Sequence, residues 1–160
     1  MKKTAYLSLG SNVGDRRANL RNAIGKLLNV GKLLGVSSFY ETEPVDFTDQ
    51  PWFLNCAVAL QTELQAEDFL AEIMAIEREL GRQRTQPKGP RTIDIDILLF
   101  GKATLNTPQL TLPHPAMHQR RFVLEPLAEI ASEVQHPVLK KSVRELLESL
   151  PKGGGAVTKI

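Results

Sequence analysis

The sequence predicts an α+β fold with a ferredoxin-like βαββαβ core, in which helices cover an antiparallel sheet. Two observations lead to this class. Predicted elements follow one another in the order strand, helix, strand, strand, helix, strand, and two of the helices are long. The chain also has 160 residues, which suits a single domain over residues 1–160 that buries about 68–70% of its unfolded surface.

In the first half of the chain, an apolar stretch at residues 4–9 predicts the opening strand. The glycine-rich segment at residues 10–14 lacks the Gly-Lys-Ser/Thr ending of a P-loop, so we interpret it as a structural turn. Asp15 can cap a helix with apolar residues on one face, namely Leu20, Ile24, Leu27 and Leu28. We then expect a strand, an irregular loop and a long strand at residues 33–42, 43–52 and 53–64.

The second half begins with a clear amphipathic helix at residues 66–80, which Gly81 is placed to terminate. Its apolar stripe consists of Phe69, Ile73, Ile76 and Leu80. A β-branched run at residues 93–100 predicts a strand. The remaining expected elements are a short strand at 102–105, helices at 122–130 and 142–150, and a flexible tail at 151–160 in which 156–160 can add a strand.

Composition and charge exclude several classes of protein. The net charge is +2 and the isoelectric point is about 8.8, which gives no global support to nucleic-acid binding. No stretch approaches the roughly 18 apolar residues of a membrane span, and the apolar run near the start is too short for a signal peptide. The single cysteine, Cys56, fits a cytoplasmic protein, and we interpret it as a small buried hydrophobe.

The most informative segment is a basic loop that runs directly into two acids. Four cations without an intervening acid come first and two carboxylates follow: Arg82, Arg84, Lys88 and Arg91, then Asp94 and Asp96. Cations favour phosphate oxygens, and arginines can grip them bidentately. The carboxylates would repel the same phosphates unless a divalent metal lay between them. The pattern therefore predicts a site for a metal–nucleotide complex, with the loop at residues 85–88 as a candidate lid.

Strand geometry places Asp94 and Asp96 on the same face, with Cα atoms about 6.5–7 Å apart. Magnesium keeps most of its ligand shell as water and phosphate oxygens, so one or two carboxylates suffice to hold it. A pair at this spacing can hold two magnesium ions. The alternative is an edge strand with a solvated polar face.

The segment Gly89-Pro-Arg-Thr-Ile-Asp-Ile-Asp-Ile-Leu-Leu-Phe-Gly101 resembles the signature of the 6-hydroxymethyl-7,8-dihydropterin pyrophosphokinases of folate biosynthesis. Three further blocks are similar to this family and occur in its order. They are Leu9-Gly-Ser-Asn-Val-Gly-Asp15, then Ser37-Ser-Phe-Tyr-Glu-Thr42 with Gln50-Pro51 and Phe53-Leu-Asn55, then Leu112-Pro-His114 with Arg120 and Phe122. The resemblance implies transfer of pyrophosphate from ATP to the hydroxymethyl group of a reduced pterin, with release of AMP, by a monomer that binds neither nucleic acid nor membrane.

The resemblance also implies a role for individual residues. Those expected at the catalytic centre are Arg82, Arg91, Asp94 and Asp96, of which Asp94 and Asp96 would bind two magnesium ions. Those expected to contact ATP are Leu70, Glu77, Arg82, Arg84, Arg91, Ile97, Thr111, His114 and Arg120. Those expected to contact the pterin are Thr42, Val45, Phe53, Asn55 and Phe122, with Phe53 and Phe122 on either side of its ring.

The chain departs from the family pattern at three positions. Lys88 and Pro115 stand where many members carry aromatics, and Phe53 replaces a tyrosine seen in some. Trp52 either covers the core or forms the rim of the pterin pocket. We interpret His118 and His136 as surface residues.

Two rival functions are weaker. Nucleotidyl transfer would use a Gly10-Ser11 turn and a nearby acid pair, but the two elements are far apart in this sequence. An RNA-binding ferredoxin-like module would carry exposed aromatics in a basic central strand, whereas this chain places two acids there.

Overall fold

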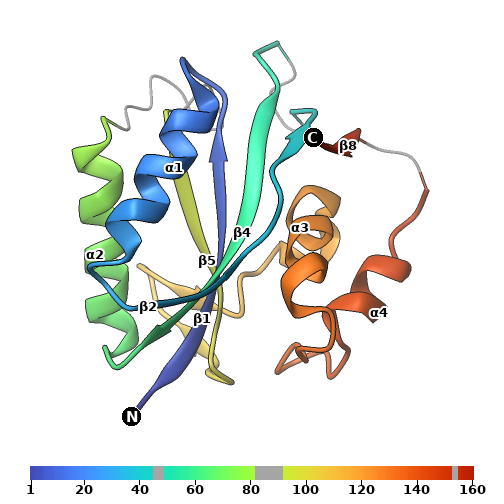
Figure 1. Ribbon diagram of the computed structural model, residues 1–160. Coiled ribbons are helices and arrows are strands. Elements are labelled where there is room, and N and C mark those ends of the chain that lie inside the picture. The colour runs from blue at the N-terminus through green and yellow to red at the C-terminus, as the bar shows by residue number, and fades with distance from the viewer. Residues whose placement is uncertain (45–48, 82–91, 153–154) are drawn as a thin grey trace.

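The computed structural model describes residues 1–44, 49–81, 92–152 and 155–160. In these residues the chain forms a six-stranded sheet, a two-stranded hairpin and helices on both faces of the sheet (Figure 1). The strands are β1 (Lys3–Ser11), β2 (Lys32–Val36), β3 (Tyr40–Thr42), β4 (Phe53–Thr62), β5 (Asp94–Phe100), β6 (Leu105–Asn106), β7 (Thr111–Leu112) and β8 (Val157–Lys159). The helices are α1 (Arg16–Leu27), α2 (Ala66–Glu79), α3 (Arg121–Ala131) and α4 (Val143–Glu148), with a 3-10 turn at Met117–Gln119.

The large sheet pairs its strands in the order β5-β1-β4-β3-β8, and β2 also pairs with β4. All of these pairs are antiparallel. When β2 and β3 are taken as two parts of one strand, the order of elements is that of a βαββαβ core. The predicted α+β class is therefore confirmed.

The single strand expected at residues 33–42 is wrong, because the chain breaks it into β2 and β3. The N–H of Ser37 donates to the carbonyl of Ala57 at 2.9 Å. The Ser37 hydroxyl in turn accepts the N–H of Ala57 at 2.8 Å. A side-chain oxygen thus takes the place of a backbone carbonyl, and the regular ladder stops at Val36 and resumes at Tyr40.

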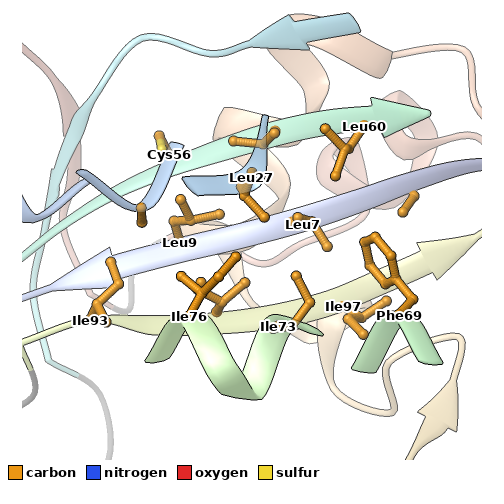
Figure 2. Packing of buried hydrophobic residues seen from close by; sticks show 14 of the residues in the cluster. Leu7, Leu9, Leu27, Cys56, Leu60, Phe69, Ile73, Ile76, Ile93 and Ile97 are labelled. Carbon is orange, nitrogen blue, oxygen red and sulfur yellow. The ribbon is translucent and has the colours of Figure 1, made fainter. Parts of the chain in front are cut away.

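The sheet separates two apolar cores. Helices α1 and α2 cover one face, and α3 and α4 cover the other (Figure 1). The first core joins Leu7 and Leu9 of β1 to the two helices on that face, including Phe69 and Ile73 of α2 (Figure 2). The second core packs α3 and α4 against buried residues such as Leu98. Both faces of the central strands are therefore buried over most of their length.

The expected helix ends are mostly confirmed. The Asp15 carboxylate accepts the N–H of Ala18 at 3.1 Å and caps α1. Gly81 follows α2 with φ of +80°, the left-handed conformation that glycine adopts readily. One helix prediction is wrong: Leu28 is 56% exposed, since it lies beyond the last turn of α1 and faces solvent.

Later segments follow the prediction with small shifts. The short strand expected at residues 102–105 begins only at Leu105, where β6 pairs with β7 in a separate hairpin. Helices α3 and α4 and the C-terminal strand β8 lie where the sequence placed them. Cys56 is buried as expected, and burial raises the pKa of its thiol to about 12, which fits a packing role. Among the described residues, no helix is long and apolar enough to cross a membrane.

The surface position expected for His136 is wrong, since this side chain is only 4% exposed. Its Nδ1 atom accepts the N–H groups of Val138 at 3.2 Å and Leu139 at 3.0 Å. His118 was also expected at the surface, yet its Nδ1 atom is buried and its ring lies 6.2 Å from that of His136. Burial, and then the neighbouring His118, lower the pKa of His136 below its usual value.

The depressed pKa of His136 predicts that stability depends on pH. The unfolded chain takes up the proton on this histidine first, so the contribution to stability is complete above about pH 6.5 and declines as the pH falls below it. Urea unfolding between about pH 7.5 and 5 checks the trend, and an NMR titration of the His136 ring measures its native pKa. The urea-unfolded chain supplies the reference, and a native value at or above that reference would contradict the prediction.

Candidate active site

Three neighbouring strands place predicted site residues in one row. Asp94 of β5 lies opposite Gly10 of β1, and Gly10 lies opposite Asn55 of β4. Residues that are directly opposite in an antiparallel sheet point to the same face. Since each step across the sheet is about 5 Å, Asp94 and Asn55 are separated by roughly 10 Å between their Cα atoms. The row therefore has a carboxylate at one end, an amide at the other and a glycine between them, and all three residues are on the same face of the sheet.

Gly10 keeps this row open. A Cβ atom at position 10 would lie 2.6 Å from Nδ2 of Asn55 and 3.4 Å from Cδ1 of Phe53. Asn55 is held in place by Thr42, whose hydroxyl donates to its Oδ1, and by its own amide, which donates to the Leu9 carbonyl at 3.3 Å. Any side chain at Gly10 would displace this fixed amide. The structure thus brings together three of the residues predicted to contact the pterin: Thr42, Phe53 and Asn55.

The acid pair lies on the face predicted from strand periodicity. Asp94 and Asp96 are partly exposed, whereas Ile95 and Ile97 are buried in the core beneath α1 and α2. Asp96 lies opposite Ser8 of β1, one step along the strand from the row of Asp94 and Gly10. The two carboxylates therefore share the face that α3 covers, and the isoleucines anchor the opposite face.

A buried carboxylate from α2 supports the strand between the two acids. Oε2 of Glu77 accepts the backbone N–H of Ile95 at 2.8 Å, and Glu77 is only 9% exposed. Within the part of the chain that the structure describes, β5 is the edge strand of the sheet, and this bond satisfies a donor on its outer side. A hydrogen bond to a charged group contributes about 1.5–3 kcal/mol.

His114 reaches the same strand through its backbone. Its N–H donates to the carbonyl of Leu98 at 2.9 Å, which ties this segment to β5. The Nδ1 atom of its ring accepts the N–H of Ala116 at 3.1 Å, so the proton of the neutral ring is on Nε2. Burial and then Arg120 lower the pKa of His114, and Asp94 opposes that shift. The ring is therefore a neutral donor within the electrostatic reach of Asp94.

Arg120 and Phe122 flank the first residue of α3. The guanidinium carbon of Arg120 lies 5.6 Å from the centre of the Phe122 ring, in cation–π geometry. Both residues line a hollow of about 300 Å³ that Glu43 and Val157 close from the side of the sheet edge. The structure therefore places a predicted phosphate contact and a predicted pterin contact on one wall.

The remaining predicted residues are not all on this face. Leu70 packs against the core beneath α1 and α2, and the side chain of Ile97 is 5% exposed in the same core. Thr111 lies on β7 and lines a second hollow of about 470 Å³ together with His114. Four predicted residues, Val45, Arg82, Arg84 and Arg91, lie outside the described residues, as do Lys88 and the candidate lid.

Residues 6–132 match the model of the 7,8-dihydro-6-hydroxymethylpterin-pyrophosphokinase family. The chain belongs to this family. It is accordingly an ATP-dependent pyrophosphokinase, a transferase of folate synthesis. The family resemblance predicted from the four sequence blocks is confirmed.

Relatives of this pyrophosphokinase are found in bacteria and in eukaryotes. The 2-amino-4-hydroxy-6-hydroxymethyldihydropteridine pyrophosphokinase of Bacillus subtilis is 49% identical over 140 residues, which are 84% of this chain and 82% of the relative. The enzyme of the same name from Methylorubrum extorquens is 43% identical, with 94% of this chain and 95% of the relative covered. A folic acid synthesis protein of Pneumocystis carinii is 42% identical over 92% of this chain, but this chain spans only 20% of that protein.

Solved structures share the fold at lower identity. An HPPK-DHPS protein of Plasmodium falciparum, crystallised with pterin and p-hydroxybenzoate, matches with a TM-score of 0.72 and 18% identity. The match covers 92% of this chain and 42% of the Plasmodium chain. At this identity, the likeness is one of fold.

Sequence reasoning missed residues that shape the candidate site through hydrogen bonds to the backbone and to other side chains. Asn12 donates to Oε1 of Gln50 at 2.8 Å and to the carbonyl of Pro51 at 3.0 Å. Arg16 donates to the carbonyl of Trp52 at 3.0 Å. These bonds fix the segment that leads into β4 against the turn after β1. An asparagine within a glycine-rich turn was a usable signal, but its partners lie 38 or more residues away.

The clearance at Gly10 predicts the effect of a single methyl group. In Gly10→Ala, the new Cβ would push against the Asn55 amide, and we expect the affinity for the reduced pterin to fall by about tenfold or more. Isothermal titration calorimetry with the pterin measures the change. Gly25→Ala is the matched control, because a Cβ at Gly25 in α1 meets nothing within 4 Å. Equal pterin affinity in the two variants would contradict the prediction.

Proposed function

We propose that this pyrophosphokinase carries out its reaction over the row formed by Asp94, Gly10 and Asn55. The reaction transfers pyrophosphate from ATP to the hydroxymethyl group of 6-hydroxymethyl-7,8-dihydropterin. The hydroxymethyl oxygen bonds to the β-phosphorus and gives up its proton to solvent, the bond from that phosphorus to the α–β bridging oxygen breaks, and AMP leaves. The row is the observation that supports the proposal, because it sets a carboxylate that suits a metal–nucleotide complex about 10 Å from a fixed amide.

Asp94 and Asp96 fit magnesium, because both are partly exposed oxygen donors on one face of an extended strand. In this proposal they hold two magnesium ions. When bound, the ions would neutralise charge on the triphosphate and orient it. The chain's own contribution is to hold the carboxylates still. Buried isoleucines on the opposite face and the bond from Ile95 to Glu77 do this.

Asn55 and Thr42 form the polar end of the proposed pterin pocket. The Thr42 hydroxyl orients the Asn55 amide, so that amide presents a fixed donor and acceptor to the edge of a planar heterocycle. Phe53 and Phe122 would stack on the two sides of the ring, and Val45 would add a backbone contact. Both substrates are small molecules, and we propose a cytoplasmic monomer that acts on them without nucleic acid or membrane.

Donors from several segments would surround the triphosphate. Arg82, Arg84 and Arg91 would contact phosphates from the basic loop, with Arg82 and Arg91 acting at the catalytic centre. His114 and Arg120 would contact the triphosphate from the other side. The neutral His114 ring carries its proton on Nε2 and can donate it in a hydrogen bond, and the nearby Arg120 is permanently charged. Leu70, Glu77, Ile97 and Thr111 would complete the nucleotide site. Catalysis would come mainly from positioning and electrostatics.

The proposed metal role of Asp94 and Asp96 can be tested with asparagine, which has the shape of aspartate without its charge. We expect Asp94→Asn or Asp96→Asn to lower kcat by about two to three orders of magnitude, since a neutral amide is a poor magnesium ligand. Asp68→Asn is the control, because Asp68 is exposed on α2. Circular dichroism melting establishes that each variant is folded. Wild-type turnover in either Asp94→Asn or Asp96→Asn would refute the metal role.

Product analysis tests the reaction itself. The protein is incubated with ATP, magnesium and 6-hydroxymethyl-7,8-dihydropterin, and nucleotides are separated by chromatography. AMP that forms only when both pterin and metal are present supports the proposal. Release of pyrophosphate would instead place the attack on the α-phosphorus, as in nucleotidyl transfer. Absence of turnover would overturn the proposal.

A further inference from the structure

The C-terminal strand β8 lies beyond the part of the chain that matches the family, which ends at residue 132. It extends the sheet past β3 and forms its outer edge (Figure 1). In the register between them, Val157 is opposite Thr42, Thr158 is opposite Glu41 and Lys159 is opposite Tyr40. This strand therefore pairs with the strand that carries a pterin residue of the proposed site.

Backbone hydrogen bonds close both ends of this pairing. The N–H of Glu43 donates to the carbonyl of Ala156 at 3.0 Å, and the N–H of Ile160 donates to the carbonyl of Phe39 at 3.0 Å. The N–H of Ala156 donates to the Glu43 carboxylate at 3.0 Å. The N–H groups of positions 156 and 160 both point toward β3. Because N–H groups alternate in direction along an antiparallel strand, the backbone N–H of Thr158 points toward β3 as well.

A carboxylate on α3 ties the same two strands to the helix. Oε1 of Glu129 accepts the hydroxyl of Tyr40 at 2.6 Å, and Nζ of Lys159 lies 3.9 Å from the same oxygen. Oε2 of Glu129 accepts the backbone N–H of Ser38 at 2.9 Å. Burial alone would raise the pKa of Glu129, but the bonds from Tyr40 and Ser38 outweigh it and lower that pKa. The ionised side chain therefore links α3, β3 and β8.

This link joins the two elements, β3 and α3, that carry the walls of the proposed pterin pocket. One wall is β3, where Thr42 orients Asn55. The other is the start of α3, where Phe122 lines the hollow that Val157 of β8 also lines. Val157 of β8 thus lies opposite Thr42 in the sheet and lines the same hollow as Phe122.

We infer that β8 is a positioning element for the pterin, which holds Thr42 and the start of α3 at the spacing that the ring requires. The inference rests on the proposed function. Its expected signature is unequal, because the acid pair is at the opposite edge of the sheet on β5, whereas Arg120, a proposed ATP contact, lies just before α3. Loss of β8 should therefore weaken the use of the pterin more than the use of ATP.

Proline substitutions separate the pairing from other effects. In Thr158→Pro, the N–H that points toward β3 is lost from the centre of the strand. In Lys159→Pro, the lost N–H points away from β3, and proline is tolerated on the outward side of an edge strand. The two variants place the same ring on adjacent residues. Because Lys159→Pro also removes the ammonium that lies 3.9 Å from Glu129, Lys159→Ala, which removes the ammonium and keeps the N–H, is measured beside it. Thr158→Val keeps the N–H and serves as the conservative variant.

We expect the KM for the pterin to rise about tenfold in Thr158→Pro, with a smaller rise in the KM for ATP. A variant lacking residues 156–160 should behave like Thr158→Pro. Thr158→Val should behave like wild type, and Lys159→Pro should behave like Lys159→Ala, because both lose the Lys159 ammonium but keep the pairing with β3. Thermal melting accompanies each assay, and the fold should survive because residues 158–160 are exposed and bury little apolar surface.

The outcomes distinguish this inference from the function on which it rests. If the wild-type chain makes no AMP, the proposed function fails. If the wild type is active and the pterin KM of Thr158→Pro and of the truncated chain equals that of Lys159→Pro, the inference about β8 fails. A parallel rise in the KM values for the pterin and ATP would also overturn it, because that pattern indicates a general loss of structure.

Discussion

The register of β1 between β5 and β4 is the constraint on which the site depends. It sets Asp94, Gly10 and Asn55 side by side, although they come from three separate parts of the chain. A slip of one residue would turn the acids into the core and the isoleucines into the site. The bulge opposite Tyr6 and Leu7 in the same pair of strands lies beyond the row, so the row itself keeps regular geometry.

The bulge also changes which face of the sheet successive residues of β5 occupy. At its start, the strand must alternate so that carboxylates face α3 and isoleucines face α2. Towards its end, Leu98 and Leu99 are both buried in the core beneath α3 and α4. Two successive residues reach the same face only where the alternation is interrupted, as the register shift allows. One strand can therefore supply a polar site at one end and a packed core at the other.

The sequence was sufficient for features that depend on local periodicity. The helix at α2, its glycine stop and the shared face of Asp94 and Asp96 all follow from spacing within one segment. Features that depend on distant partners were not accessible. The break at Ser37 needs the backbone of Ala57, and His136 lies with its ring 6.2 Å from that of His118, which comes from before α3. Nothing in a lone glycine at position 10 indicates that an asparagine 45 residues later will lie against it.

The carboxylate end and the amide end of the row are supported by different helices. The acidic end depends on an edge strand that is supported from α2 by Glu77. The amide end depends on β3 and α3, joined through Glu129. Among the described residues, the hydrogen bonds that support the two ends share no residue, although Arg120, a proposed ATP contact, lies just before α3. Changes to one support should therefore act mainly on one substrate, while a change at Gly10 acts where the two substrates must meet.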